Sequence, residues 1–291
     1  MKKYSETIKS WIRKEKIINQ PQTENKPKIF HEMIGTGKKQ ILFIHGFGLN
    51  RKSWNDISPM FAEKATVYMV DLIGFGDSPA PKNWPYTIEA QADVLINFIM
   101  HKDLKNVVII GHSYGGGVGL MLLHKMIKNE CSTRIKKLIL IAPASFPQAL
   151  PFFMVLPCIP FIGSFLLKNL NAEFLMTLTL KKIVKNKKKI TRERIQRYID
   201  NIMKRSHRHA LIQTAKHIIP KEIDKVLEKI EQIYHSTLLI YGQNDSVILK
   251  QNLEKLSRTL PNVETKKVPN CGHVPHEENP KIVAGLISEF L

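Results

Sequence analysis

The sequence predicts an α/β fold: a mostly parallel central sheet with helices on both faces and a helical cap inserted along the chain. Short, continuous apolar runs rich in β-branched residues alternate with helical patterns. Strands that are apolar throughout are typical of a parallel sheet covered on both sides. With 291 residues, 43% of them hydrophobic, the chain can bury one large core and a smaller appended lobe.

Six apolar runs are the candidate strands, and the last of them is the weakest. They are Ile41–His45, Thr66–Val70, Val107–Ile110, Lys137–Ile141, Thr237–Tyr241 and Glu264–Val268. Helical spacing fills the gaps between them. It predicts helices over Thr87–Met100, where Thr87 is a candidate N-cap, and over Gly115–Lys128.

The alternation fails between about Ser145 and Gln232. There the sequence turns from apolar and proline-broken to lysine-rich and helical before strand signals resume. We therefore predict a core formed by residues 1–144 and 233–291, with residues 145–232 as a helical cap or lid. The uncharged stretch Leu138–Leu167 has the length of a membrane span, but its start resembles a buried strand and five prolines would break a helix through the rest.

The N-terminal segment MKKYSETIKSWIRKEKIINQ has no continuous apolar stretch of the kind that a secretory signal needs. Tyr4, Ile8, Trp11 and Ile12 fall on one helical face with lysines around them. A helix packed on the body is favoured, and a helix lying on a membrane surface is the alternative. We expect a cytoplasmic protein, with peripheral membrane association left open.

Three cysteines form an odd and sparse set without metal-ligand spacing: Cys131, Cys158 and Cys271. We expect free thiols in a reducing compartment. Cys271 lies two residues before a candidate catalytic histidine, so its oxidation would perturb the site, although a small loop residue is the favoured interpretation.

The segment NVVIIGHSYGGGVGLMLLHK has the pattern strand, tight turn, helix, with Gly111-x-Ser113-x-Gly115 at the turn. The glycines let the backbone pass close to a strained serine, whose hydroxyl then projects at the carboxyl end of the sheet. Ser113 is therefore the candidate nucleophile. The backbone N–H groups of Phe47 and Tyr114 are the candidate oxyanion hole, and His45 is expected to fix the Phe47 loop by side-chain hydrogen bonds.

Asp245 and His273 are the candidate partners of Ser113. Asp245 lies just beyond a strand end, from which a carboxylate can orient an imidazole, although an aspartate there could also serve as a turn or helix cap. His273 follows the last strand in a glycine- and proline-rich loop. His112 and His276 compete with it for the role of base, and His273 is favoured over both.

The motifs GHSYGG, HGFG, VDLIGFGDSP, YGQND and CGHVPHEENP resemble the motif set of the α/β-hydrolase superfamily, in particular its serine esterases and lipases with a cap domain. The resemblance covers the core and not the cap. The chain order Ser113, Asp245, His273 is the order of that architecture. The resemblance implies structural roles for Asp71 and Asp77, and it disfavours haloalkane dehalogenase and epoxide hydrolase chemistry, which uses an aspartate at the position of Ser113.

The expected function is hydrolysis of a carboxylic ester with an apolar acyl group through a Ser-His-Asp acyl-enzyme mechanism, with neither cofactor nor metal. Apolar side chains between Phe146 and Leu166 are candidates for an acyl pocket, or they pack the cap on the core. The same triad also serves carbon–carbon bond hydrolases, perhydrolases and hydrolases of acyl-carrier-protein esters or thioesters. A catalytically silent scaffold that binds a lipid or a protein is the alternative of another class.

The net charge of +19 and the basic cap make acidic partners plausible. Between Lys181 and Arg208 the chain has twelve Lys and Arg against only Glu193 and Asp200. Such a run is most often a solvated helix face. The sharper hypothesis is a docking surface for an anionic membrane or an acidic carrier protein. Nucleic-acid binding is disfavoured because the basic residues lack interleaved aromatics.

Overall fold

The computed structural model describes residues 27–155, 159, 171–219 and 229–291. Three sequence predictions fall outside these residues. They are the N-terminal helix with Tyr4, Ile8, Trp11 and Ile12, the free thiol of Cys158, and the part of the apolar cap segment within 156–158 and 160–170.

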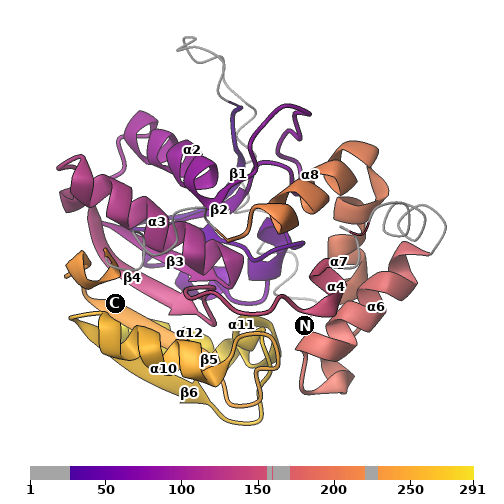
Figure 1. Ribbon diagram of the computed structural model, residues 1–291. Coiled ribbons are helices and arrows are strands. Elements are labelled where there is room, and N and C mark those ends of the chain that lie inside the picture. The colour runs from indigo at the N-terminus through magenta and orange to yellow at the C-terminus, as the bar shows by residue number, and fades with distance from the viewer. Residues whose placement is uncertain (1–26, 156–158, 160–170, 220–228) are drawn as a thin grey trace.

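A six-stranded sheet in the order β2-β1-β3-β4-β5-β6 forms the centre of the molecule (Figure 1). The first half of β1 pairs antiparallel with β2, from Phe30 with Asp71 to Ile34 with Val67, and the second half is in parallel register with it, from Gln40 with Thr66 to Ile44 with Val70. Every other neighbouring pair of strands is parallel. This arrangement confirms the predicted fold class. The strands are β1 Phe30–Ile44, β2 Ala65–Asp71, β3 Val107–His112, β4 Ile135–Ile141, β5 Thr237–Gly242 and β6 Val263–Val268.

Strand β1 begins well before the run Ile41–His45 that the sequence predicts. Its first half pairs antiparallel with β2, with register shifts after Ile34. Most of the side chains in this half are partly or fully exposed. The apolar-run criterion misses it because an edge pair with one solvated face has no continuous apolar sequence.

Alternation along the strands gives the sheet two apolar faces. Leu42 and Ile44 point into one buried cluster, and Ile41 and Phe43 point into the other. Each large side chain removed from water stabilises the fold by about 1.5–3 kcal/mol. One face is covered by α2 (Ile88–His101), α3 (Tyr114–Lys128) and α10 (Lys250–Thr259), and the other by η1 (Arg51–Trp54), η2 (Ser58–Phe61) and α12 (Pro280–Phe290). Thr87 caps α2 as expected, accepting the Ala90 N–H at 3.2 Å.

The described α-helices between β4 and β5 group on one side of the core (Figure 1), whereas η6 contacts α3. These four described α-helices lie within the segment predicted to be the cap, whose boundaries at 144/145 and 232/233 stay predictions. Within the described residues, no helix combines the length and the hydropathy needed to cross a membrane. The helices are α4 Phe152–Val155, α6 Ala172–Ile183, α7 Arg192–Met203 and α8 Arg205–Lys216, with the short turns η5 Lys187–Lys189 and η6 Ile230–Gln232; η3 Ser132–Arg134 precedes β4 and α11 Pro275–Glu278 precedes α12.

Candidate active site

Ser113 occupies a strained turn between β3 and α3. Its φ of 50° and ψ of −116° lie in a region that L-residues rarely adopt, and such a conformation costs about 1–3 kcal/mol. Backbone hydrogen bonds hold it there: the Ser113 N–H donates to Ile141 O at 2.9 Å, and Ser113 O accepts the Gly116 and Ala144 N–H groups, each at 2.9 Å. These hydrogen bonds hold the strained conformation, which places the hydroxyl at the tip of the turn.

The two flanking glycines make this turn sterically feasible. A Cβ at Gly111 would lie 2.5 Å from Gly115 O, and a Cβ at Gly115 would lie 2.3 Å from Ile44 O. These distances are far below contact, and the atoms in the way are backbone. The glycines of the G-x-S-x-G motif are thus required by close approach of β1, β3 and α3.

The structure brings Ser113, His273 and Asp245 together, and we call these three residues the serine cluster. Ser113 follows β3, Asp245 follows β5 and His273 follows β6. His273 Nε2 lies 2.9 Å from Ser113 Oγ, and His273 Nδ1 lies 2.9 Å from Asp245 Oδ2. Because an ionised carboxylate only accepts, Nδ1 carries the proton and Nε2 is free to accept the hydroxyl proton.

The local environment keeps Asp245 ionised. Burial by itself would raise its pKa, but the neighbouring His273 and hydrogen bonds to the carboxylate together lower the pKa below its usual value. Asp245 Oδ1 accepts the N–H groups of Val247 at 2.8 Å and Ile248 at 3.1 Å. These bonds occupy Oδ1, so Oδ2 faces the imidazole.

The loop that carries His273 is fixed both by residues of the core and by residues of the segment predicted to be the cap. His112 Nε2–H donates to the His273 carbonyl oxygen at 2.8 Å, and the His273 N–H donates to Ile183 O at the end of α6, also at 2.8 Å. Next to it, Glu278 Oε1 accepts the Gly272 N–H at 2.7 Å. Glu278 Oε2 accepts the backbone N–H groups of two cap residues, Lys185 at 2.9 Å and Asn186 at 3.0 Å.

A second set of contacts fastens α7 behind this loop. Arg194 pairs with Glu277 at 2.9 Å, and Tyr198 donates its hydroxyl proton to the same carboxylate. Arg197 binds Asp56 through two 3.1 Å contacts. The sequence analysis did not identify any of these residues or Glu278. One sequence signal for Glu277 and Glu278 is the run EEN directly after the His273 loop. It places carboxylates beside that loop but does not predict which residues they contact.

The competing histidines are held in structural contacts. Burial, more than the neighbouring His273, lowers the pKa of His112 to about 3, and burial lowers the pKa of His276 well below its usual value. The His276 ring packs at a tilt against Trp54 at a centroid distance of 4.4 Å and against His112 at 4.6 Å. Both rings are therefore neutral at pH 7. A catalytic base would contact the Ser113 hydroxyl, whereas His112 hydrogen-bonds the His273 backbone.

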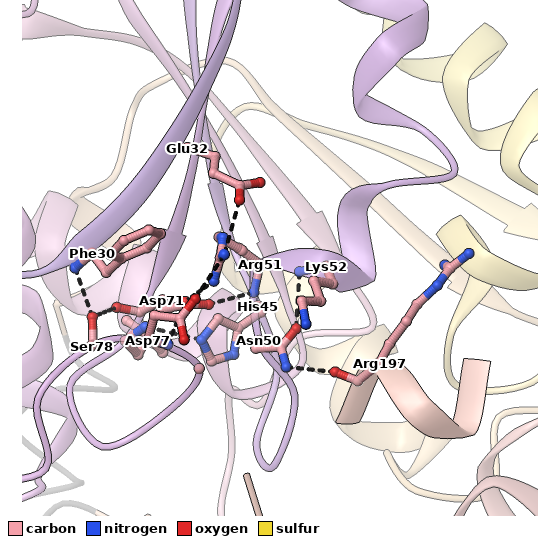
Figure 2. A network of polar contacts seen from close by, with 12 residues as sticks. Phe30, Glu32, His45, Asn50, Arg51, Lys52, Asp71, Asp77, Ser78 and Arg197 are labelled. Carbon is pink, nitrogen blue, oxygen red and sulfur yellow. Dashed lines mark hydrogen bonds and ion pairs between the residues drawn. The ribbon is translucent and has the colours of Figure 1, made fainter. Parts of the chain in front are cut away.

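The loop between β1 and η1 presents Phe47 beside Ser113, at the wall of a cavity described below. His45 fixes its start as expected: Nδ1–H donates to Gly46 O at 2.8 Å, and Nε2 accepts the Leu72 N–H at 3.0 Å. Asn50 fixes its end by donating to the Arg197 carbonyl oxygen in α7 at 2.8 Å (Figure 2). Tyr114 is the first residue of α3, so its N–H has no partner within the helix.

An ionic network with a buried centre at Arg51 and Asp71 and an exposed end at Asp77 lies under the same loop, and we call Glu32, Arg51, Asp71 and Asp77 the Arg51 cluster (Figure 2). Asp71 accepts the Arg51 N–H at 2.7 Å, the Asp77 N–H at 2.8 Å and a contact from the Arg51 guanidinium. Arg51 also contacts Glu32 and Asp77, each at 2.9 Å. Burial alone would lower the pKa of Arg51, but the surrounding carboxylates raise it, so the guanidinium stays charged. The structural roles expected for Asp71 and Asp77 fit these contacts, whereas Arg51 was not anticipated.

Two apolar cavities meet at Ser113. The large cavity has a volume of about 670 Å³ and is lined by Ser113, His112 and His273 together with apolar residues of α4 and α6. The small cavity has a volume of about 90 Å³ and is lined by Ser113 and Tyr114 together with apolar residues of α3 and of the segment after β4. A substrate bonded to Ser113 would therefore be surrounded mainly by apolar side chains.

The described residues contain no group of three or more His, Cys, Asp or Glu side chains arranged to hold a metal ion. Cys131 and Cys271 are free thiols, as expected for the described cysteines. Burial raises the pKa of Cys271 to about 12, so this thiol stays protonated beside the His273 loop.

Comparison with known proteins places this geometry in a family. A family model described as "alpha/beta hydrolase fold" matches residues 39–280. A Mycoplasma genitalium protein provisionally named esterase/lipase 2 is 27% identical over 286 residues, which cover 92% of this chain and 96% of that protein. The 2-hydroxymuconate semialdehyde hydrolase of Pseudomonas sp. (strain CF600) is 23% identical, with 94% of this chain and 97% of that protein covered.

Among solved structures, a thermophilic esterase from Thermogutta terrifontis is similar with a TM-score of 0.76 at 23% identity, covering 94% of this chain and 96% of that chain. Structural similarity at this level of sequence identity shows a shared fold and no more. The family model covers most of the chain, and the matched residues include the strained serine turn and the loops of both of its partners. The chain is therefore a member of the α/β-hydrolase fold family, with relatives among proteins named as esterases and lipases.

Proposed function

We propose that this protein is a serine hydrolase that cleaves carboxylic esters with an apolar acyl group, using Ser113 as nucleophile. The observation that carries the proposal is the 2.9 Å contact between Ser113 Oγ and His273 Nε2 at the wall of an apolar cavity. Asp245, bonded to the other imidazole nitrogen, completes the arrangement that activates a serine. The esterase relatives support the same reaction class.

In the acylation half-reaction, Ser113 Oγ attacks the ester carbonyl carbon while His273 Nε2 takes the hydroxyl proton. Asp245 holds the Nδ1–H tautomer and stabilises the imidazolium that forms. The backbone N–H groups of Phe47 and Tyr114 would bind the oxyanion, and losing one such donor costs about 2.7–4 kcal/mol of transition-state stabilisation. The carbon–oxygen bond to the alcohol then breaks, and His273 donates its proton to the departing oxygen.

In the deacylation half-reaction, water attacks the Ser113 ester with His273 again as base. The proton returns to Ser113 Oγ as the carboxylic acid leaves. Each half-reaction is a proton transfer coupled to acyl transfer, so the serine cluster supplies the nucleophile and the proton-transfer groups, and the N–H groups of Phe47 and Tyr114 supply the oxyanion donors.

A carbon–carbon bond hydrolase is the second candidate, because the relative from Pseudomonas sp. is named as a 2-hydroxymuconate semialdehyde hydrolase. Cleaving such a bond makes a carbon leaving group that develops negative charge, which polar neighbours would have to stabilise. Among the described residues that line the large cavity next to His273, Lys182 is the one lysine, arginine, aspartate or glutamate, and it is exposed. The apolar lining therefore favours an ester, and identification of the products separates the two reactions.

The decisive experiment is labelling with a fluorophosphonate probe alongside hydrolysis of p-nitrophenyl esters from acetyl to palmitoyl. We expect labelling and turnover in the native protein and neither in Ser113→Ala, with activity lower by on the order of a million-fold. Identical melting of the two proteins provides the control for folding. A native protein that is folded but unlabelled would instead support the silent scaffold, and turnover that survives in Ser113→Ala would refute the nucleophile.

We further propose that the exposed basic side of the cap docks on an anionic lipid surface. Lys181, Lys182 and Lys185 are exposed near the end of α6, and the apolar side chains of Phe174 and Leu178 on the same helix are 53% and 48% exposed. Lysines that flank exposed apolar side chains suit a membrane surface better than an acidic protein. The fraction of protein that sediments with vesicles containing phosphatidylserine should fall as the salt concentration rises. A bound fraction that does not change with salt would contradict the proposal.

A further inference from the structure

The two cavities differ in which residues of the site they contact, and this difference assigns a role to each. The large cavity contacts Ser113 and the His273 imidazole, whereas Tyr114 does not line it. The small cavity contacts Ser113 and Tyr114, whereas His273 does not line it. Phe47 lines both cavities, so the residues that tell the two sides of Ser113 apart are His273 at the large cavity and Tyr114 at the small one.

Ester chemistry fixes which part of a substrate must lie on each side. In the tetrahedral intermediate the reacting carbon bears Ser113 Oγ, the oxyanion, the alcohol oxygen and the acyl chain. The alcohol oxygen must come within hydrogen-bonding reach of His273 Nε2 to receive its proton, so the alcohol group extends into space beside His273. The acyl chain then takes the remaining direction, past Tyr114.

Resting on the proposed function, we infer that the small cavity binds the acyl chain and the large cavity binds the alcohol. An apolar cavity of about 150 Å³ accommodates benzene, so a volume of about 90 Å³ admits roughly three to four carbon atoms. The large cavity, at about 670 Å³, admits roughly 25 atoms on the same scale. The substrate is an ester of a short-chain acid, up to about pentanoate, with a bulky apolar alcohol.

This assignment sharpens the expectation from the sequence, in which the apolar cap side chains form an acyl pocket. The described cap helices α4 and α6 line the large cavity, which here receives the alcohol. The small cavity is built largely from α3 and the segment after β4. Helix α3 and the first part of the predicted cap, directly after β4, would then select the acid, and α6 would select the alcohol.

A pair of isomeric esters tests the assignment in the native protein. Octyl butanoate and butyl octanoate have the same atoms and differ only in which side of the ester group bears the long chain. We expect kcat/KM, measured in a pH-stat, to be at least about 30-fold higher for octyl butanoate, because several methylenes of an octanoyl chain have no space in the small cavity. Equal rates, or a preference for butyl octanoate, would overturn the assignment.

Two matched substitutions locate the limit on acyl length. Met121 lines the small cavity and Met176 lines the large cavity, and both side chains are buried. Met121→Ala should raise kcat/KM for butyl octanoate about tenfold, whereas Met176→Ala should leave the limit on acyl length in place and change only the dependence on the alcohol. The opposite pattern would mean that the two cavities have exchanged roles.

Fluorophosphonate labelling in the same samples separates the two proposals. Labelled, folded protein that hydrolyses p-nitrophenyl butyrate but does not distinguish the isomeric esters refutes the cavity assignment alone. Protein that is folded yet neither labelled nor active refutes the hydrolase itself. Because the isomer comparison uses the native chain, it stands even if Met121→Ala does not fold.

Discussion

The serine cluster and the Arg51 cluster are two polar sites with buried centres at the carboxyl ends of strands. They differ in whether their hydrogen-bonding groups contact only the protein or also face a cavity. In the Arg51 cluster both carboxylate oxygens of Asp71 accept donors from within the protein. In the serine cluster the chain of contacts runs from Asp245 through His273 to the Ser113 hydroxyl, which lies at the wall of two cavities.

This difference shows why burial and altered pKa values do not identify an active site by themselves. Arg51, Asp245 and His112 all have shifted pKa values, yet only the serine cluster places a nucleophile beside space for a reactant. The Arg51 cluster instead fixes the loop that presents Phe47. We therefore expect substitutions in the serine cluster to reduce activity with little loss of stability, and those in the Arg51 cluster to do the reverse.

The largest expected effect is that of Asp245→Asn. An amide in place of the carboxylate favours the wrong imidazole tautomer, and kcat should fall by on the order of 10⁴-fold. Steady-state hydrolysis of p-nitrophenyl butyrate measures kcat, and urea unfolding measures stability. A loss of stability that accounted for the loss of activity would erase the contrast between the clusters.

The matched change in the other cluster, Asp71→Asn, should act on stability. It leaves the buried Arg51 guanidinium without its main counter-charge, and the free energy of unfolding should fall by about 3 kcal/mol, with Glu32 and Asp77 limiting the loss. In conditions where the variant is folded, the rate of fluorophosphonate labelling at Ser113 should stay within severalfold of the native rate. Labelling that is abolished in folded protein would assign Asp71 to the chemistry.

The sequence predicts the serine cluster better than the Arg51 cluster for a physical reason. Ser113, Asp245 and His273 each follow an apolar run, and the carboxyl ends of parallel strands converge at one edge of a sheet. Local pattern is therefore enough to bring them together. Arg51 and Glu278 lie in stretches whose pattern shows only polarity, because their partners are distant in the sequence.

The same reasoning explains the strands. Five of the six predicted runs match observed strands closely in extent. For β2, β3, β4 and β5 the burial is nearly continuous and leaves a continuous apolar run, whereas β6 is mostly exposed, which is why its run is the weakest of the six. The run in β1 covers only the second half of that strand, because its first half is an edge pair with one solvated face. The cap was predicted only as helical, since the packing of its helices depends on contacts such as Arg194 with Glu277.

A buried neutral histidine lies beside each cluster, His45 near Arg51 and His112 near His273, and both should make stability fall in acid. Burial lowers the pKa of His45 to about 4 and that of His112 to about 3. An unfolded histidine titrates near 6.5, so between that pH and about 4 the unfolded chain binds more protons than the folded one. Stability therefore rises with pH in this window, and at pH 5 each histidine should reduce the free energy of unfolding by about 2 kcal/mol relative to pH 7.5.

Urea unfolding between pH 7.5 and 5 measures this slope. His112→Gln keeps an N–H donor for the His273 carbonyl oxygen but removes a titrating group, so the stability lost between pH 7.5 and 5 should shrink by about 2 kcal/mol, with His45 and His276 still contributing to the slope. The contribution of Asp245 lies lower on the pH scale, because its lowered pKa is passed only below the usual aspartate range. A stability that does not change between pH 7.5 and 5 would contradict the burial of both rings.

The smallest expected effect is at Glu278, which joins the His273 loop to the cap. In Glu278→Gln one carboxylate oxygen becomes an amide N–H₂ that faces backbone donors, at a cost of about 1–3 kcal/mol in stability. Because Gly272 adjoins His273, kcat should also fall by about tenfold, whereas Glu254→Gln, at a half-exposed side chain of α10 that pairs only with Lys250 and Arg258 on the surface, should change neither quantity. If Glu278 only held the cap in place, KM would rise with kcat unchanged. A fall in kcat at constant KM would instead show that the cap, through Glu278, keeps the imidazole in register with Ser113.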